Sequence, residues 1–253
     1  MRSVTSKLPE WVKEALRPLR RVVEGLLYAG EGRFCPVCGK SSRRFKPSPI
    51  DGREDAQCVH CDALERHRLV WLFIQKKTTL FDDKSKKMLH VAPESCLEPR
   101  FRERMGDNYI TADLLNPRAM IKMDITDIQC ADQSFDGIAC SHVLEHVQDD
   151  RRAMREFCRV LKNDGWAIFL VPVTSDHTIE DPSIIDPKER LRVFGQADHV
   201  RRYGPDFVNR LREAGFTVEI VGINDVVNDR EAVEMGLTAD TGTIYYCTKQ
   251  TCS

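Results

Sequence analysis

The sequence predicts an α/β protein whose main domain follows a small cysteine-rich module. From residue 86 onward, apolar strand-like runs alternate with helical patterns, which is typical of a largely parallel sheet with helices on both faces. Two Cys-x₂-Cys pairs precede this region, and an amphipathic stretch precedes the pairs. We therefore expect three parts: a helical segment at 1–32, a metal module with a linking helix at 33–80, and an α/β domain at 81–253.

The composition is that of an ordinary globular protein. Its 253 residues are 42% hydrophobic and 30% charged, and the formal net charge is -1. This balance gives no bulk electrostatic attraction to nucleic acid or to an acidic membrane surface. No apolar run approaches the roughly 20 residues that a bilayer crossing needs, and the start has no apolar core like that of a secretory signal. We therefore expect a cytoplasmic protein without a membrane span.

Residues 8–29 place apolar side chains at helical spacing, with Lys and Arg on another face. Pro9 suits a first helical turn, whereas Pro18 interrupts the pattern and predicts a kink or two short helices. We favour a helix that docks on the rest of the protein. A membrane-surface helix or a partner-binding helix is the alternative.

Four closely paired cysteines form a specific motif. Cys35 and Cys38 are followed, after about twenty residues, by Cys58 and Cys61, which is the tetrathiolate zinc pattern. Each pair suits a tight turn, so that both of its sulfurs can face one ion. Four thiolates close the coordination sphere, so the predicted Zn²⁺ is structural and contributes folding energy. A redox Cys-x₂-Cys is the alternative, and the other six cysteines read as ordinary small apolar residues.

A helix is predicted at 62–77, directly after the second pair. Its residues 65–68, Glu-Arg-His-Arg, are either a functional cluster or ion pairs that fix an interface, and both readings stay open. His60 lies between two ligand cysteines, and we expect it not to bind the metal.

The α/β region divides into elements by pattern. Expected strands are 86–93, 108–114, 119–125, 134–141, 165–173, 217–223 and 242–249, and expected helices are 96–104, one or two within 143–162, and 204–216. Ligands of such sheets lie at the carboxyl ends of the strands, where the winding direction switches. The residues to examine are therefore 90–94, Asp113, Asp124 and 141–142.

Residues 86–249 resemble a class I S-adenosylmethionine-dependent methyltransferase of the type 11-like kind. The most specific part is 134–173, in which a Phe-Asp strand is followed by His-Val-Leu-Glu-His, Arg-Val-Leu-Lys, a Gly turn and an apolar strand. The resemblance implies a Rossmann-like, seven-stranded sheet and S-adenosylmethionine as cofactor. It also implies that Asp113 accepts the ribose hydroxyls and that Asp124 meets the adenine amino group. The expected cofactor-binding residues are His90, Ala92, Pro93, Glu94, Asp113, Leu114, Asp124, Ile125 and Ser141.

The first loop of the domain departs from that family. It is normally glycine-rich and follows an acidic residue, whereas here it reads Leu-His-Val-Ala-Pro-Glu-Ser, without glycine and with His90 in the place of the acid. Glu94 is then a candidate for the cofactor's ammonium or ribose. The alternative is a weakened cofactor site in a domain that serves as a scaffold. We favour binding, because Asp113 and Asp124 are both present.

Residues 141–146, Ser-His-Val-Leu-Glu-His, contain the spacing of an inverted zinc-protease motif. In the methyltransferase pattern the same residues follow a central strand and begin the next helix. A motif counts only with its structural context, and no further protease feature accompanies this one. We therefore favour the methyltransferase interpretation.

Residues 174–207 form a long polar insertion with little apolar periodicity. It is either a solvated excursion held by ion pairs or a lid whose Arg and His residues contact a polar or anionic acceptor. A hydroxyl or amine acceptor needs a proton acceptor, for which His142 and His199 are the candidates. A second, His-rich zinc site in this region is a weaker option.

Two functions follow from these patterns. The favoured one is methyl transfer from S-adenosylmethionine to an unidentified polar acceptor. The alternative is a non-catalytic module that binds nucleic acid or protein, for which the basic-aromatic run 43–46, Arg-Arg-Phe-Lys, provides the surface. The near-neutral total charge disfavours nucleic acid as the partner.

Overall fold

The computed structural model describes residues 19–20 and 22–250. Contacts group these residues into two compact units. The cysteine unit comprises the described residues up to Trp71 together with Val227–Thr241, and the α/β unit comprises Leu72–Val226 together with the described residues from Gly242. The three-part division into 1–32, 33–80 and 81–253 stays a prediction beside this grouping.

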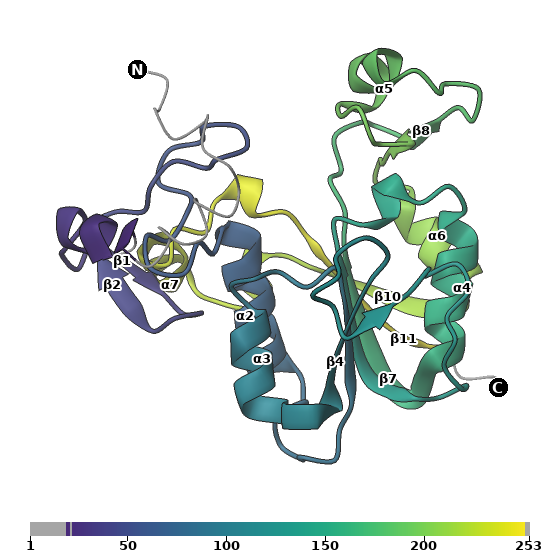
Figure 1. Cartoon of the computed structure of the whole chain (residues 1–253), viewed down its shortest axis with the longest axis horizontal. Coiled ribbons are helices and arrows are strands. Elements are labelled where there is room, and N and C mark those ends of the chain that lie inside the picture. The colour runs from purple at the N-terminus through teal and green to yellow at the C-terminus, as the bar shows by residue number, and fades with distance from the viewer. Residues whose placement is uncertain (1–18, 21, 251–253) are drawn as a thin grey trace. The chain divides into compact units, whose positions relative to one another are not determined.

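A seven-stranded sheet forms the centre of the α/β unit, in the order β10-β11-β7-β6-β3-β4-β5 (Figure 1). The strands are β3 (Met88–Val91), β4 (Tyr109–Asp113), β5 (Ile121–Lys122), β6 (Phe135–Ser141), β7 (Leu161–Leu170), β10 (Phe216–Val221) and β11 (Ile244–Lys249). Strands β5, β4, β3, β6 and β7 run parallel, and β11 is antiparallel to both of its neighbours. The predicted Rossmann-like fold class is therefore confirmed, and the winding direction switches between β3 and β6.

Helices cover both faces of this sheet. In Figure 1, α3 (Glu98–Met105) lies on one face, and α4 (Asp150–Val160) and α6 (Phe207–Glu213) lie on the other. Helix α4 begins at Asp149, whose side chain accepts a hydrogen bond from the backbone N–H of Arg152. Because both faces are covered, the central strands are almost continuously apolar, and β3 is buried over its whole length.

The cysteine unit contains little regular structure. A hairpin of β1 (Arg33–Cys35) and β2 (Lys40–Ser42) carries the first cysteine pair, and the first part of α2 (Glu65–Lys77) follows the second pair. Helix α7 (Asp229–Glu234) comes from near the other end of the chain and packs on β1. Short 3₁₀ helices occur across the two units at Gly106–Asn108, Leu144–His146, Ile223–Asp225 and Ala239–Thr241.

The insertion 174–207 is more regular than its sequence pattern suggested. Strands β8 (Ile179–Glu180) and β9 (Arg201–Arg202) form an antiparallel pair, and α5 (Pro187–Phe194) lies between them (Figure 1). Helix α5 has clear end signals: the Asp186 side chain caps two backbone N–H groups, and Gly195 ends the helix with a φ of 91°.

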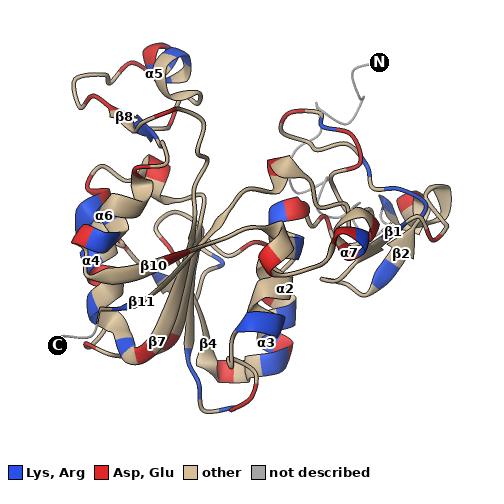
Figure 2. Ribbon diagram, turned by 180° about the vertical axis from the view of Figure 1, so that it is seen from behind, with Lys and Arg blue, Asp and Glu red and all other residues tan. Residues whose placement is uncertain are grey.

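Most of the predicted amphipathic segment, 8–18 with both prolines, lies outside the described residues. Residues 19–20 and 22–27 are helical, and their apolar side chains Leu19, Val23 and Leu26 are exposed. Docking of this segment stays a prediction. Within the described part of the chain, the helices are too short or too polar to span a bilayer. Figure 2 shows acidic and basic residues mixed along α4 and α6, as the near-neutral net charge suggests.

Candidate active site and cysteine cluster

The four paired cysteines meet in space. The Sγ atoms of Cys35, Cys38, Cys58 and Cys61 all lie within 4.8 Å of one another. Mutual hydrogen bonding, strongest through Cys35, lowers the pKa of the Cys58 thiol and raises that of Cys61. Four sulfurs this close cannot all ionise unless a cation balances their charge. The cluster therefore fits Zn²⁺ held by four thiolates, which is a closed and structural arrangement.

The two cysteine pairs lie on matching turns. The backbone N–H of Gly39 donates to the carbonyl of Cys35 at 2.8 Å, and that of Asp62 donates to the carbonyl of Cys58 at 3.0 Å. Gly39 and Asp62 both have positive φ, at 70° and 65°. His60 is not one of the clustered ligands; its ring Nε2 lies 3.2 Å from the carbonyl of Ser41.

Arg68 is a structural residue of the cysteine unit. Its fully buried guanidinium donates to the carbonyls of Ala56 and Ala63 at 2.9 Å and of Gly236 at 3.0 Å. It also stacks 4.2 Å above the centre of the Phe45 ring. This one side chain joins three parts of the chain. Of the two interpretations of the run 65–68, a functional cluster or residues that fix an interface, the second therefore holds for Arg68.

The proposed nucleic-acid surface at 43–46 is contradicted at two of its four residues. Phe45 is only 1% exposed, and Lys46 is 7% exposed with its ammonium group 2.9 Å from both Glu24 and Asp62. A buried ring cannot stack on a base, and an ammonium group paired with two carboxylates has no free charge for a phosphate. Burial under Arg68 is a tertiary effect that the local basic-aromatic pattern does not reveal.

The predicted cofactor residues gather at the carboxyl edge of the parallel strands. Val91 of β3 pairs with Ala112 of β4 on one side and Cys140 of β6 on the other. The following residues, Ala92, Asp113 and Ser141, therefore stand side by side, about 4.8 Å apart from strand to strand. Exposure varies along the set: His90 and Ile125 are buried, Ala92, Pro93, Glu94, Asp113 and Ser141 are intermediate, and Leu114 and Asp124 are exposed.

Two residues at this edge have an unusual backbone conformation. Ala92 has a φ of 48° and His142 a φ of 55°, and they directly follow the neighbouring strands β3 and β6. Each is held by a 2.8 Å backbone hydrogen bond, to the carbonyls of Ala112 and Leu170. Such conformations are costly for residues with a Cβ and concentrate at functional sites. Ala92 thus adopts a conformation that glycine tolerates best, at a position where the resemblance to the family implies glycine.

His90 connects the first loop to the sheet. Its Nδ1 lies 2.7 Å from the hydroxyl of Tyr109, and its Nε2 lies 2.7 Å from a carboxylate oxygen of Glu94. The ring is almost fully buried, whereas the Glu94 side chain is partly exposed. The loop therefore does contain an acidic residue, Glu94. His90, which stands where the family has its acid, holds Glu94 in place.

The two aspartates at the edge each use one oxygen for their own loop. Oδ1 of Asp113 accepts the backbone N–H groups of Leu115 and Asn116, at 2.7 and 2.8 Å. Oδ1 of Asp124 accepts the backbone N–H and the hydroxyl of Thr126, and these hydrogen bonds lower the pKa of Asp124. This arrangement orients both side chains and leaves Oδ2 of each for a ligand. Ser141 adds a buried hydroxyl without a hydrogen-bond partner.

A histidine–glutamate cluster lies after β6. Nδ1 of His142 is 3.4 Å from Oε1 of Glu145, and the rings of His146 and His199 meet edge-on with their centres 4.7 Å apart. Burial lowers the pKa of His199. His199 comes from the distant insertion, so its meeting with Glu145 and His146 was missed at the sequence level. The only local signal was the His-x-x-Glu-His spacing, which sits here on a short 3₁₀ helix.

Two residues at the base of the insertion are structural, and one of them, Arg201, is an arginine that the lid interpretation offered to a substrate. Arg201 pairs with Glu180 at 3.0 Å. Arg201 is buried and donates to the carbonyls of Leu144, Val147 and Gln148. The hydroxyl of buried Tyr203 donates to Asp150 at 2.6 Å. Ion pairs therefore do hold the base of the insertion, as the first of the two interpretations expected.

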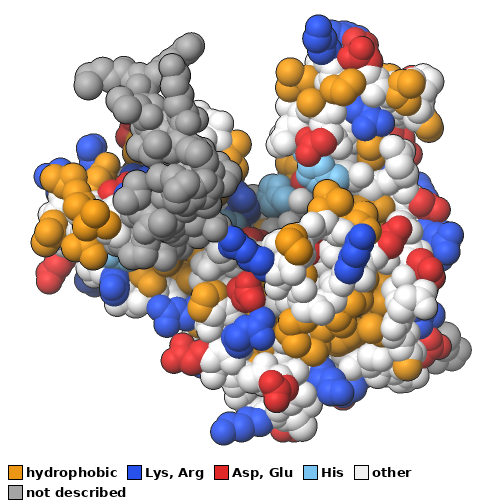
Figure 3. All heavy atoms as spheres, viewed as in Figure 1, with side chains coloured by type: hydrophobic (Ala, Val, Ile, Leu, Met, Phe, Trp, Pro, Cys, Tyr) orange, Lys and Arg blue, Asp and Glu red, His pale blue; other side chains and the backbone are white. Residues whose placement is uncertain are grey.

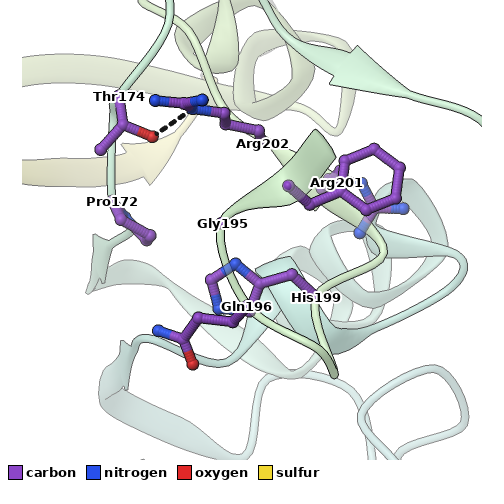
Figure 4. Close-up of a pocket in the computed structure, with 8 residues that line it drawn as sticks. Pro172, Thr174, Gly195, Gln196, His199, Arg201 and Arg202 are labelled. Atoms are coloured by element: carbon purple, nitrogen blue, oxygen red, sulfur yellow. Dashed lines mark hydrogen bonds between the residues drawn. The ribbon is translucent and has the colours of Figure 1, made fainter. Parts of the chain in front are cut away.

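A small pocket of about 140 Å³ opens between the end of β7 and the insertion. Figure 4 shows His199 and Gln196 together on one wall and Arg202 on the other, where its Nε donates to Thr174 at 2.8 Å. Further lining comes from Pro172, Phe194, Gly195 and Arg201. The lining is mixed, and Arg202, Gln196 and His199 are the groups in it that could hydrogen-bond a polar or anionic molecule.

Comparisons with known proteins agree with this geometry. Residues 83–169 match the methyltransferase domain family model. The uncharacterized methyltransferase YcgJ of Bacillus subtilis is 38% identical over 71 residues, which are 28% of this chain and 26% of that protein. The chain thus matches about a quarter of the length of this curated relative.

The similar solved structures have low sequence identity to this chain. YcgJ itself is 16% identical, with 73% of this chain and 100% of that chain covered and a TM-score of 0.47. An S-adenosylmethionine-dependent methyltransferase of Mesorhizobium loti is 15% identical, with 71% of this chain and 97% of that chain covered and a TM-score of 0.48. The 1,6-didemethyltoxoflavin-N1-methyltransferase of Burkholderia thailandensis is 12% identical, with 72% and 76% covered and a TM-score of 0.47. The family match over residues 83–169 and the strand order of the sheet identify a methyltransferase domain with a Rossmann-like fold, and a zinc-ribbon-like cluster of four cysteines accompanies it.

Proposed function

We propose that the protein is an S-adenosylmethionine-dependent methyltransferase that acts on a polar or anionic acceptor. The observation that carries this proposal is the left-handed backbone of Ala92 at the carboxyl edge, with Asp113 beside it on the next strand. A left-handed backbone is the conformation that glycine adopts most easily, and its presence in a loop without glycine supports the assignment of this loop to the cofactor.

The edge residues fit the parts of the cofactor. Oδ2 of Asp113 would accept the ribose hydroxyls, and Asp124 would meet the adenine amino group between Leu114 and Ile125. Glu94, oriented by His90, would bind the ammonium group of the methionine part. The open backbone at Ala92 and Pro93, with the hydroxyl of Ser141 on the other side, would let the cofactor approach the sheet closely.

When bound, S-adenosylmethionine supplies a methyl group on a sulfonium; the acceptor's lone pair forms the new bond to carbon while the electrons of the C–S bond pass to sulfur. The chain's own contribution is placement of the acceptor in line with that bond and removal of its proton. His142 and His199 remain the proposed proton acceptors. Gln196, Arg202 and Thr174 would position the acceptor in the pocket, under the insertion as a lid.

The cysteine cluster completes the proposal. Zn²⁺ held by Cys35, Cys38, Cys58 and Cys61 would stabilise the loops of its unit, and no step of methyl transfer requires it. The non-catalytic alternative loses its main support, because Phe45 and Lys46 are buried.

Titration calorimetry of the full-length, zinc-loaded protein with S-adenosylmethionine and S-adenosylhomocysteine tests the proposal. We expect both to bind, and we expect Asp113→Ala to weaken binding by about tenfold or more, roughly 1.4 kcal/mol. Asp164→Ala is the matched control, since this exposed aspartate lies within β7 and away from the carboxyl edge. Folded wild-type protein that binds neither ligand would overturn the proposal, and unchanged affinity in Asp113→Ala would remove Asp113 from the site.

A further inference from the structure

One group of metal-ligating side chains in the α/β unit is separate from the predicted cofactor residues. A carboxylate oxygen of Glu145 and one ring nitrogen each of His146 and His199 all lie within 4.8 Å of one another. Two imidazoles and one carboxylate are a common ligand set for divalent transition metals. Figure 3 shows histidine side chains at the surface of this unit. Glu145 and His199 are buried, whereas the His146 side chain is 35% exposed, so the group is reachable from solvent through His146.

The glutamate of this group is in an unusual position. Its side chain is 2% exposed, and Oε2 is buried without a hydrogen-bond partner. Oε1 faces Nδ1 of His142 at 3.4 Å. A buried carboxylate oxygen with no partner has lost its hydration without a compensating hydrogen bond, which destabilises the folded state. A cation beside Glu145 would satisfy that oxygen.

Both histidines have the outer partners that metal-binding histidines use. Asp198 faces Nδ1 of His146 at 3.2 Å, which leaves Nε2 for a ligand. His199 forms a hydrogen bond with the backbone of Phe194. A carboxylate or a backbone carbonyl on the second ring nitrogen fixes the tautomer and orients the first nitrogen toward a metal.

The backbone brings the two segments of the group together before any ion binds. The N–H of Val200 donates to the carbonyl of Glu145 at 2.9 Å. The guanidinium of Arg201 binds three carbonyls of residues 144–148, and the hydroxyl of Tyr203 reaches the first of them at 3.3 Å. His199 is thus held against Glu145 and His146 by buried contacts on its carboxyl-terminal side.

We propose that Glu145, His146 and His199 bind one divalent transition cation, such as Zn²⁺, Co²⁺ or Mn²⁺. Three protein ligands leave coordination positions open, in contrast to the closed cysteine cluster. His199 also lines the polar pocket, so an open position would face a molecule bound there. In the proposed methyltransferase this position would hold an acceptor oxygen, and proton removal would fall to His142; this extension rests on the proposed function, whereas cation binding itself does not.

Cobalt titration of the protein that carries one equivalent of zinc tests the site without cofactor or acceptor. We expect one equivalent of Co²⁺ to bind while one equivalent of Zn²⁺ stays in the cysteine cluster, as measured by calorimetry and elemental analysis. Cobalt bound to the cysteines would show thiolate charge-transfer absorption, and its absence would assign the cobalt to nitrogen and oxygen ligands. Because no methyl transfer is measured, this result is independent of the result with S-adenosylmethionine.

Variants assign the cation to its residues. His146→Ala and Glu145→Gln should each weaken Co²⁺ binding by more than about tenfold, and Asp198→Asn by about tenfold through loss of orientation. His177→Ala is the control, since this exposed histidine of the insertion is outside the group and should leave binding unchanged. The His146 side chain is 35% exposed, so its removal tests the site even where the Glu145 variant does not fold. Wild-type protein that binds no cobalt, or a His146 variant that binds like wild type, would overturn the proposal.

Discussion

The two groups of metal-ligating side chains are built in opposite ways. The cysteine cluster takes its ligands from two short turns with matching hydrogen bonds and positive φ at Gly39 and Asp62. The group of Glu145, His146 and His199 takes its ligands from two segments far apart in the sequence, joined by Arg201 and Tyr203. In the first case a metal would organise the backbone, whereas in the second the backbone is organised already. The first arrangement suits structural support, and the second suits binding of an exchangeable ligand.

The largest effect is expected from loss of metal in the cysteine cluster. Cys58→Ser removes a buried ligand, and structural zinc contributes on the order of 10 kcal/mol to folding. Hydrogen exchange should show loss of protection in residues 33–63, while the strands of the α/β unit stay protected. Cys130→Ser, outside the cluster, serves as the control. Full protection in the Cys58 variant would mean that the backbone of this unit does not depend on metal.

Asp150→Ala tests the buried contacts that anchor the insertion beside the group of Glu145, His146 and His199. The buried carboxylate of Asp150 accepts hydrogen bonds from Tyr203 at 2.6 Å and from Arg210 at 3.0 Å. Removal of one partner of a buried ion pair should lower the free energy of unfolding by about 3–5 kcal/mol in denaturant titrations. Asp132→Ala should cost less than about 1 kcal/mol, since its pair with Arg159 is at the surface. Equal losses in the two variants would contradict the anchoring role of Asp150.

Ala92→Gly should have a smaller and opposite effect. Glycine accepts a φ of 48° without strain, so we expect the free energy of unfolding to rise by about 1 kcal/mol and cofactor affinity to be retained. Ala153→Gly is the matched control, because it makes the same substitution at a position of α4 with ordinary helical backbone. It should lower the free energy of unfolding by about 1 kcal/mol or more. If Ala92→Gly destabilises to a similar degree, the backbone at 92 is not strained.

The smallest effect concerns the acid stability of the insertion. Hydrogen bonding from Arg210, and secondarily from Arg201, lowers the pKa of Glu180 to about 2. A carboxyl whose pKa is depressed in the folded state stabilises above its ordinary pKa, and this contribution is lost as pH falls from 4.5 toward about 2. The difference in unfolding free energy between wild type and Glu180→Gln should therefore shrink over that range. Solvent screening keeps the difference modest, and a difference independent of pH would exclude the ion pair as its cause.

Prediction from the sequence succeeded where the signal is local. Apolar runs and their alternation predicted a largely parallel sheet with helices on both faces, the resemblance of 134–173 to a family added the Rossmann-like class, and cysteine spacing predicted the four-sulfur cluster. Helix 187–194 was missed although Asp186, Pro187 and Gly195 mark its ends, because the segment lacks apolar periodicity. The burial of Arg68, the carbonyl contacts of Arg201 and the meeting of His199 with Glu145 depend on residues distant in sequence. No local pattern contains that information.

The contact between Arg68 and Gly236 has a consequence for how this protein could have been assembled. The cysteine unit is discontinuous, since its last helix arrives only after most of the α/β sheet has been synthesised. A ribosome would release the cysteine turns long before the carbonyl of Gly236 exists to receive the guanidinium. The contacts of Arg68 in this unit are therefore complete only after the segment 227–241 has been synthesised.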